Sequence, residues 1–187
     1  MSSNIEDQLR NILGQYKDSF ITKEYNEENN DHDVLMDVFG ITPDLKRENR
    51  QYWGRELGKC WERIVCKVFE LKCENYKSAL KVGDDEPCDC IVGTDAMEAK
   101  YRIGSGDSGF SKKIRQYGKD LTELKYNPII LILREDNLPS AISTCKKAGW
   151  NVYIGEQTFQ YISEKANFDL LGWLNDFKND GYFKIGR

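Results

Sequence analysis

Apolar and polar positions along the chain follow two spacings, one typical of helices and one typical of strands. Between residues 51 and 72 an apolar side chain recurs every three or four positions, which predicts a long helix with one buried face. Its apolar stripe consists of Leu57, Trp61, Ile64, Val65 and Val68. Similar spacing predicts helices over residues 5–20, 111–124, 139–148, 157–165 and 168–177. Thr42-Pro43 marks one more helix start, because threonine caps a helix and proline fits its first turn.

Short apolar runs between these segments predict the strands of a sheet. Residues 129–133 are apolar throughout, as expected of a strand buried on both faces. Further strands are expected over 78–82 and 150–154, with a loop over 83–87, and residues 87–100 read as two short strands joined by a tight turn. The predicted order is therefore helix, three strands, helix, strand, and a final helix–strand pair.

The hairpin over residues 87–100 brings charged residues together. Side chains alternate between the faces of a strand, so Glu98 and Lys100 point the same way. If residues 94–95 form a two-residue loop, Asp89 lies opposite Lys100 and joins them on that face. A three-residue loop would turn Asp89 to the other face, so this prediction depends on the register.

Two carboxylates and one ammonium on a mostly apolar hairpin indicate a reactive site, because buried charges are costly unless they are paired or bind a metal. Acidic oxygens together with backbone carbonyl and water suit Mg²⁺. A lysine beside them can orient an attacking water or help to deprotonate it. Asp89, Glu98 and Lys100 therefore predict metal-assisted hydrolysis of a phosphodiester. The alternative is that Glu98 and Lys100 belong to an ordinary exposed strand face.

Composition fits a single globular domain, since 31% of the 187 residues are charged and 40% are apolar. We expect a cytoplasmic protein without a membrane segment, because no apolar run is long enough to span a bilayer and no signal peptide is recognisable. The six cysteines should then be buried thiols, and Cys88-x-Cys90 lacks the second ligand pair of a zinc site. A single histidine, His32, excludes sites built on several histidines.

The net charge of −4 hides an uneven distribution. Acidic residues gather over residues 24–37, whereas lysines and arginines follow the hairpin. The basic segment contains Lys100, Arg102, Lys112, Lys113, Arg115 and Lys119. Because the local field matters more than net charge for binding a phosphate backbone, this segment predicts contact with DNA. The alternative is a solvated helix face.

The order of Asp89 followed by Glu98-x-Lys100, on the second and third strands of this element order, resembles the PD-(D/E)XK nuclease superfamily. One departure is that Cys88 separates Pro87 from the aspartate, which directly follows the proline in most of that family. The resemblance covers about residues 51–155. It implies an α/β fold with a restriction-endonuclease-like three-layer core, in which helices flank a mixed central sheet. Residues 1–187 then form one domain with helical flanks at both ends.

A closer resemblance follows from the residues after the motif. The run Glu98-Ala99-Lys100-Tyr101-Arg102, with a Gly-Ser-Gly loop and a lysine-rich helix behind it, looks most like a type II restriction endonuclease, in particular the ApaLI-like family. This resemblance implies that Asp89, Glu98 and the Ala99 carbonyl hold Mg²⁺ and that Lys100 is the catalytic lysine. No organic cofactor is implied.

The superfamily resemblance also implies a helix glutamate that completes the metal shell through water, often in a G-x-x-x-E pattern. Residues 58–62 have this pattern and precede the aspartate at a similar distance. We therefore predict Glu62 as this residue and keep Glu56, at the other border of the apolar stripe, as the alternative. Either glutamate is equally compatible with an ordinary helix surface.

Double-stranded DNA is the expected partner, cut at a specific short, palindromic site. A restriction enzyme that reads a palindrome is expected to be a symmetric homodimer. The glycine-rich loop over residues 104–109 would let the backbone approach DNA closely. The predicted DNA contacts are Arg102, Ser105, Gly106, Asp107, Ser108, Lys112 and Lys113.

Three other interpretations stay open. A repair or junction-resolving nuclease would have the same fold, and a non-catalytic DNA-binding or nucleotide-binding module would use the acidic residues structurally. Residues 104–109 also match the G-x-G-x-x-G dinucleotide fingerprint between a strand and a helix. Against this last interpretation, the strand before the loop has Glu98, Lys100 and Arg102 on one face, whereas the first strand of a dinucleotide-binding fold is buried on both faces.

Overall fold

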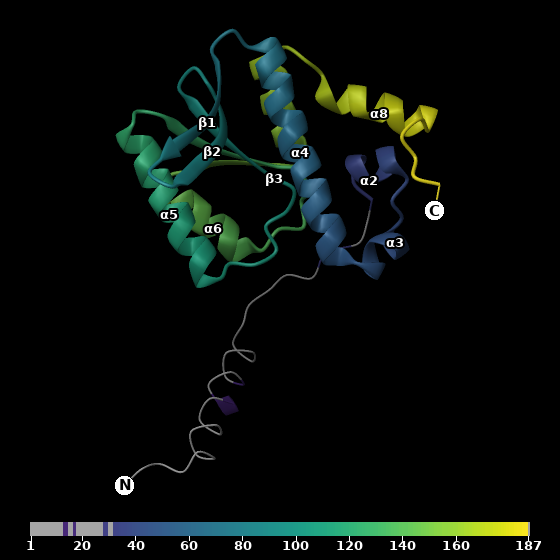
Figure 1. Ribbon diagram of the computed structural model, residues 1–187, viewed down its shortest axis with the longest axis horizontal. Helices are drawn as coiled ribbons and strands as arrows, with labels where there is room; N and C mark the ends of the chain where they lie inside the picture. Colours follow the sequence, from purple (N-terminus) through teal and green to yellow (C-terminus); the bar gives the residue numbers. More distant parts are fainter. Residues whose placement is uncertain (1–12, 15–16, 18–27, 30–31, 187) are drawn as a thin grey trace.

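The computed structural model describes residues 13–14, 17, 28–29 and 32–186 (Figure 1). Most of the predicted helix over residues 5–20 and most of the acidic segment over 24–33 lie outside these residues.

A five-stranded mixed sheet forms the centre of the molecule (Figure 1). Its strands lie side by side in sequence order: β1 (Tyr76–Val82), β2 (Asp85–Val92), β3 (Asp95–Lys100), β4 (Asn127–Ile132) and β5 (Asn151–Ile154). Two tight turns make β1, β2 and β3 antiparallel, whereas helical crossovers make β3, β4 and β5 parallel. The predicted element order is thus confirmed.

The helices are α2 (Val34–Phe39), α3 (Pro43–Glu48), α4 (Arg50–Lys72), α5 (Ser108–Glu123), α6 (Pro139–Lys147), α7 (Glu156–Ala166) and α8 (Leu170–Asp180). Buried residues of α2, α4, α7 and α8 share one core with one face of the sheet. Buried residues of α5 and α6 share a second core with the opposite face. The predicted three-layer α/β fold, with helices on both sides of a mixed sheet, is confirmed.

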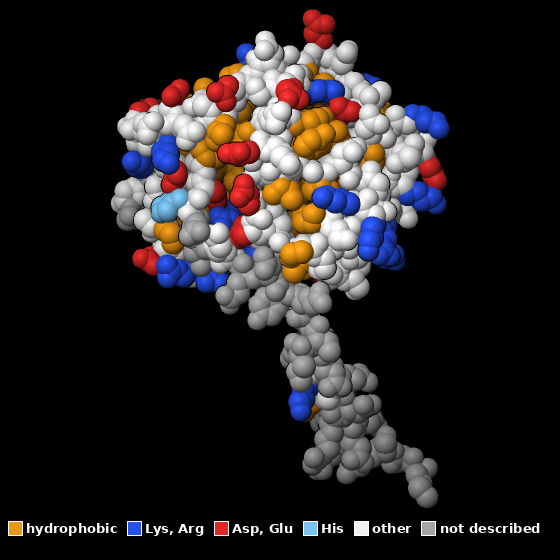
Figure 2. Space-filling view, turned by 180° about the vertical axis from the view of Figure 1, so that it is seen from behind, with side chains coloured by type: hydrophobic (Ala, Val, Ile, Leu, Met, Phe, Trp, Pro, Cys, Tyr) orange, Lys and Arg blue, Asp and Glu red, His pale blue; other side chains and the backbone are white. Residues whose placement is uncertain are grey.

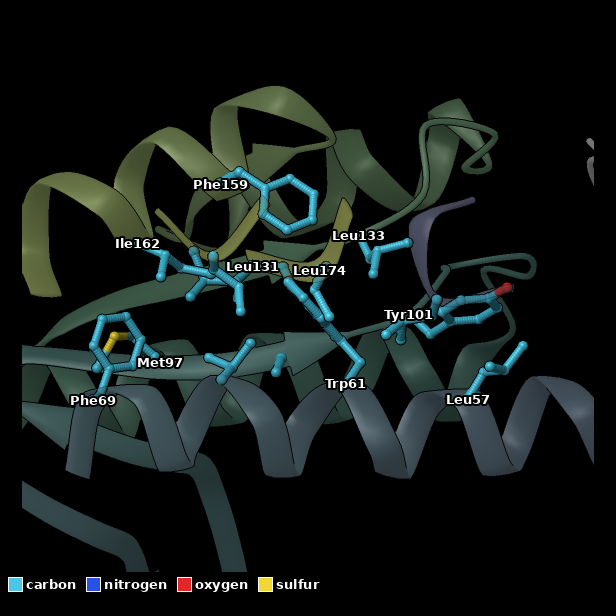
Figure 3. Close-up of a cluster of buried hydrophobic side chains, with 14 of the residues drawn as sticks. Leu57, Trp61, Phe69, Met97, Tyr101, Leu131, Leu133, Phe159, Ile162 and Leu174 are labelled. Atoms are coloured by element: carbon cyan, nitrogen blue, oxygen red, sulfur yellow. The ribbon is translucent and has the colours of Figure 1, made fainter. Parts of the chain in front are cut away.

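The larger core is centred on α4 (Figure 3). Trp61 is fully buried, packs edge-on against Phe159 of α7, and donates a hydrogen bond from Nε1 to the backbone oxygen of Leu131 at 3.3 Å. Ile64 and Val68 of the predicted stripe are only half-buried, whereas the core includes Phe69 instead. This indole bond anchors α4 directly to the backbone of β4, the neighbour of β3.

Two elements differ from the predictions. Strand β2 begins at Asp85, inside the predicted loop over 83–87, because Gly83 and Asp84 alone complete the turn from β1. Helix α2 was not predicted and begins directly after Asp33, within the acidic segment over residues 24–37. Asp33 caps it by accepting hydrogen bonds from the backbone nitrogens of Leu35 and Met36, so this acidic residue serves helix formation.

The surface shown in Figure 2 has charged side chains of both signs, with hydrophobic side chains between them in separate patches. Within the part of the chain that the structure describes, no helix is both long and apolar enough to cross a membrane.

Candidate active site

The β2–β3 hairpin has a different turn from the predicted one. Val92 pairs with Asp95, so the two-residue loop is Gly93-Thr94, and Gly93 adopts a positive φ of 62° that glycine tolerates best. The register therefore differs by two positions from the predicted pairing of Asp89 with Lys100, and that pairing is wrong. A shift by an even number of residues leaves every side chain on its face. The glycine itself was the signal that could have located the turn.

Asp89 lies beside the end of the β2–β3 ladder. Cys90 pairs with Met97, and beyond this pair the Asp89 carboxylate takes over as acceptor: Oδ2 accepts a hydrogen bond from the backbone nitrogen of Ala99 at 2.7 Å. This bond fixes one carboxylate oxygen next to the strand that holds Glu98 and Lys100. The side chain is half-buried, so water reaches only part of it.

Glu98 and Lys100 form an ion pair on β3, with 12% and 38% of their side chains exposed. Burial raises the pKa of Asp89 to about 7, and the charges of Glu98 and Glu62 act in the same direction. Burial also raises the pKa of Glu98. For Lys100 burial lowers the pKa, but the negative charges of Glu98, Asp89 and Glu62 together outweigh it, and the net shift is upward. The ammonium is therefore held charged beside an excess of acidic groups.

The structure distinguishes the two helix glutamates. Glu62 is exposed on α4, and its charge acts on Asp89, Glu98 and Lys100 alike. Glu56, six residues earlier on the same helix, instead accepts a hydrogen bond from Arg55 Nε at 2.8 Å and lies 3.5 Å from Lys59 Nζ. Among the two, Glu62 is the one placed toward the candidate site.

The glycine-rich loop lies between β3 and α5. Asp107 is the N-cap of α5 and accepts a hydrogen bond from the backbone nitrogen of Phe110 at 2.8 Å, so α5 begins at Ser108 rather than at residue 111. Gly106, Asp107 and Ser108 are exposed, and Ser105 is half-buried.

The exposed side of α5 is basic. Lys112 and Lys113 are both exposed. Lys112 lines a shallow hollow together with Arg115 and Lys119. Their spacing of three and four residues places them on one helix face. This spacing could have added Arg115 and Lys119 to the list of predicted DNA contacts.

Arg102 is placed differently from the other predicted DNA contacts. Its Nε lies 3.1 Å from Oδ2 of Asp136 in an ion pair, and only 14% of its side chain is exposed. The guanidinium is thus engaged inside the protein.

A metal ion at this site would be held by few protein ligands. Among the residues described, no group of three or more histidine, cysteine, aspartate or glutamate side chains is arranged to bind a metal. All six cysteines are free thiols as predicted, but only Cys88, Cys90 and Cys145 are buried, and the other three are half-buried. Asp89 and Glu98 supply two acidic side chains from neighbouring strands, and the Ala99 backbone lies between them in space. Oxygen donors with a net negative charge suit a hard divalent cation that keeps several waters.

A mixed sheet between two helical layers places the chain in the α/β class with a restriction-endonuclease-like fold. The model of the ApaLI-like restriction endonuclease family matches residues 1–179, and the chain belongs to this family. It is therefore a type II restriction endonuclease, an endodeoxyribonuclease that acts on DNA. Restriction endonucleases generally use a divalent metal. None of the curated proteins or solved structures compared with the chain matches it.

Proposed function

We propose that this enzyme cleaves double-stranded DNA at a specific short palindrome with Mg²⁺, in a PD-(D/E)XK site formed by Asp89, Glu98 and Lys100. The observation that supports it best is the contact of these charges at the β2–β3 hairpin. An ion pair joins Glu98 to Lys100, and the Asp89 carboxylate is bonded to the amide between them. Burial raises the pKa values of both carboxylates, and the Glu98 charge adds to the rise for Asp89, an energetic cost that a bound cation would remove.

Asp89, Glu98 and the Ala99 carbonyl would hold the metal, which supplies Lewis-acid stabilisation of charge on the phosphate. Lys100 would orient a water molecule for in-line attack on phosphorus, because its ammonium lies at the same acidic cluster and remains charged. Glu62 would bind an outer water from the α4 side, as a positioning group. This division of roles follows the charges of the site: acids bind the cation, and the lysine faces water and phosphate.

We further propose that residues 105–108 approach the DNA backbone and that Lys112 and Lys113 contact phosphates. Each lost phosphate contact should lower the slope of log K against log salt by about 0.9. Changing both lysines to glutamine should therefore weaken binding to all sequences alike and flatten the slope. Glutamine at Lys125, an exposed lysine beyond the end of α5, is the matched control and should leave the slope unchanged.

The homodimer is also a proposal, and α8 offers a surface for it. Leu170 and Leu174 are buried, so one side of α8 packs on the same subunit, mainly against α2. Next to Leu170 on the helix surface, Trp173 is partly exposed and lines an apolar groove together with Leu170 and with Leu71 of α4. We place the dimer contact on this groove. Trp173→Ser should shift the sedimenting species from dimer to monomer, whereas Tyr182→Ser, an exposed aromatic outside the groove, should not.

A digest of plasmid and genomic DNA tests the function itself. With Mg²⁺ we expect discrete bands whose sequenced ends share a short palindrome, and with Ca²⁺ we expect binding without cleavage. Nicking confined to four-way junctions would indicate a repair or junction-resolving nuclease instead. Cleavage that survives exhaustive chelation would rule out the carboxylate metal site.

A further inference from the structure

The Arg102 side chain folds back along the chain instead of extending toward solvent. Its Nε donates hydrogen bonds to the carboxylate of Asp136 at 3.1 Å and to the Asp136 backbone oxygen at 3.0 Å. Both side chains are largely buried, with 14% and 10% exposed. A paired, largely buried guanidinium has little charge left to offer a phosphate, and moving it would leave an unpaired carboxylate.

Gly104 makes room for this guanidinium. A Cβ atom at position 104 would lie 2.1 Å from Nη1 of Arg102 and 3.1 Å from its Cζ, so the arginine occupies the space that a side chain would need. The close approach ties Arg102 to the first residue of the glycine-rich loop. The loop glycine therefore has a role in packing an arginine, independent of any approach to DNA.

A second set of hydrogen bonds holds Ile103, the residue between Arg102 and Gly104. Asn137 Oδ1 accepts from the backbone nitrogen of Ile103 at 2.7 Å, and the Ile103 oxygen accepts from the nitrogen of Leu138 at 2.8 Å. Asn137 is itself buried and donates from Nδ2 to the Arg134 oxygen at 2.6 Å. The connection between β4 and α6 thus clamps the chain between Lys100 and the loop.

Asp136 is firmly placed within that connection. Besides Arg102, its carboxylate accepts hydrogen bonds from Arg134 Nε at 2.8 Å and from the backbone nitrogen of Asn29 at 2.9 Å. Arg134 in turn bonds Asp33 at 2.8 Å. A carboxylate held by several donors is a rigid anchor for the arginine that reaches it.

We propose that Arg102 and Asp136 are positioning residues, which fix the loop over residues 104–109 relative to Lys100, and that Arg102 is not a phosphate contact. This inference rests on the proposed approach of that loop to DNA. Lys100 ends β3 and Arg102 follows two residues later, so the Arg102–Asp136 pair lies between the catalytic lysine and the loop. DNA held by the loop is then presented to the reacting groups in a fixed geometry.

Amide hydrogen exchange of the DNA-free protein tests whether Arg102 and Asp136 hold the loop in place. In Arg102→Gln and in Gly104→Ala the amide of Ile103 and those of residues 104–109 should exchange about tenfold faster than in the wild type. The reason is that the hydrogen bonds of Arg102 to Asp136, which fix this stretch against the β4–α6 connection, are lost or displaced. Lys165→Gln breaks another partly buried pair, 2.6 Å from Asp95 at the opposite end of β3, and should leave these amides unchanged. Unchanged exchange in Arg102→Gln would overturn the proposal.

DNA binding and cleavage separate positioning from phosphate contact. Arg102→Gln should lower kcat about tenfold through misplaced DNA, while its salt slope stays at the wild-type value. Arg102→Lys keeps the positive charge but replaces the planar guanidinium and its several donors by a single ammonium group. Arg102→Lys should therefore recover part of the kcat that Arg102→Gln loses. A slope lowered by about 0.9 in Arg102→Gln would overturn the proposal in favour of a phosphate contact. An unchanged salt slope in the Lys112 and Lys113 double variant would instead count against the proposed DNA contacts. The hydrogen-exchange result does not depend on those contacts, because it is measured without DNA.

Discussion

Replacing Asp89 by asparagine should stabilise the metal-free protein, although it should abolish cleavage. Asparagine has nearly the same shape and its Oδ1 can still accept the hydrogen bond from Ala99. The change removes one negative charge from a half-buried cluster that also contains Glu98 and Glu62. The folded protein would thus lose a repulsion and keep its packing.

The pKa of Asp89 sets the size of this effect. Burial, together with the Glu98 charge, raises it from 3.8 to about 7, so the folded state binds the proton more tightly than the unfolded state. Stability from this group is therefore highest at low pH and falls as pH rises from about 4 to about 7. At 1.36 kcal/mol per pH unit the full penalty would be roughly 4 kcal/mol. Because water screens a partly exposed carboxylate, we expect about 1–2 kcal/mol at pH 8.

Urea denaturation at pH 8, with and without Mg²⁺, measures the effect. Without metal, Asp89→Asn should unfold at higher urea than the wild type. With Mg²⁺ at about 100 times its Kd the wild type should gain about 2.7 kcal/mol, whereas Asp89→Asn should gain much less.

Asp95→Asn, on the same hairpin, is the matched control. Burial acts to raise the Asp95 pKa, but hydrogen bonds led by that of Lys165 outweigh it and lower the pKa. Asp95→Asn should therefore lose stability in the metal-free protein. If Asp89→Asn lost as much stability as Asp95→Asn, or if Mg²⁺ stabilised Asp89→Asn as much as the wild type, the electrostatic reasoning would be refuted.

Other predictions concern the core, acid stability and the helix glutamate. Trp61→Phe should lower the free energy of unfolding by about 1–3 kcal/mol, because a buried backbone oxygen of β4 loses its partner; an unchanged urea midpoint would contradict this. Burial tends to raise the pKa of Asp136, but hydrogen bonds from Arg134 lower it, so its contribution is present above the unfolded pKa and lost as pH falls through the folded value. Below about pH 4 the wild type should lose stability more steeply than Asp136→Asn, and equal slopes would be inconsistent with the pairing. Glu62→Gln should lower kcat more than Glu56→Gln; the reverse order would reassign the helix glutamate.

The spacing of apolar residues predicted the fold well because it reflects which side chains are buried. The stripe of α4 and the apolar run of β4 each follow from one-sided or complete burial, and the structure buries the run and three of the five stripe residues, Leu57, Trp61 and Val65. Turns were predicted less well. The hairpin turn lies at Gly93-Thr94, one residue before the predicted loop, since the positive φ of Gly93 decides it. Helix α2 was not predicted, because its Asp33 cap lies among the acidic residues of the segment over 24–37 and was not recognised as a cap.

The candidate site followed from the sequence as far as spacing determines which face a side chain occupies. Glu98 and Lys100 share a face of β3 because they are two residues apart. The observed ladder ends at Cys90, and Asp89 joins them through the hydrogen bond that its Oδ2 accepts from the Ala99 nitrogen. The pairing of Arg102 with Asp136 could not be predicted this way. It joins residues 34 positions apart, from the ends of two parallel strands, and only the tertiary arrangement brings them together.

Cleavage of plasmid DNA by purified Lys100→Ala, compared with the wild type in Mg²⁺, tests the central claim most directly. The β2–β3 ladder is formed by backbone hydrogen bonds and 38% of the Lys100 side chain is exposed, so the variant should have the circular dichroism spectrum of the wild type. We predict discrete DNA fragments from the wild type and none from Lys100→Ala under the same conditions. Cleavage by a folded Lys100→Ala at the wild-type rate would contradict the assignment of Asp89, Glu98 and Lys100 as one catalytic unit.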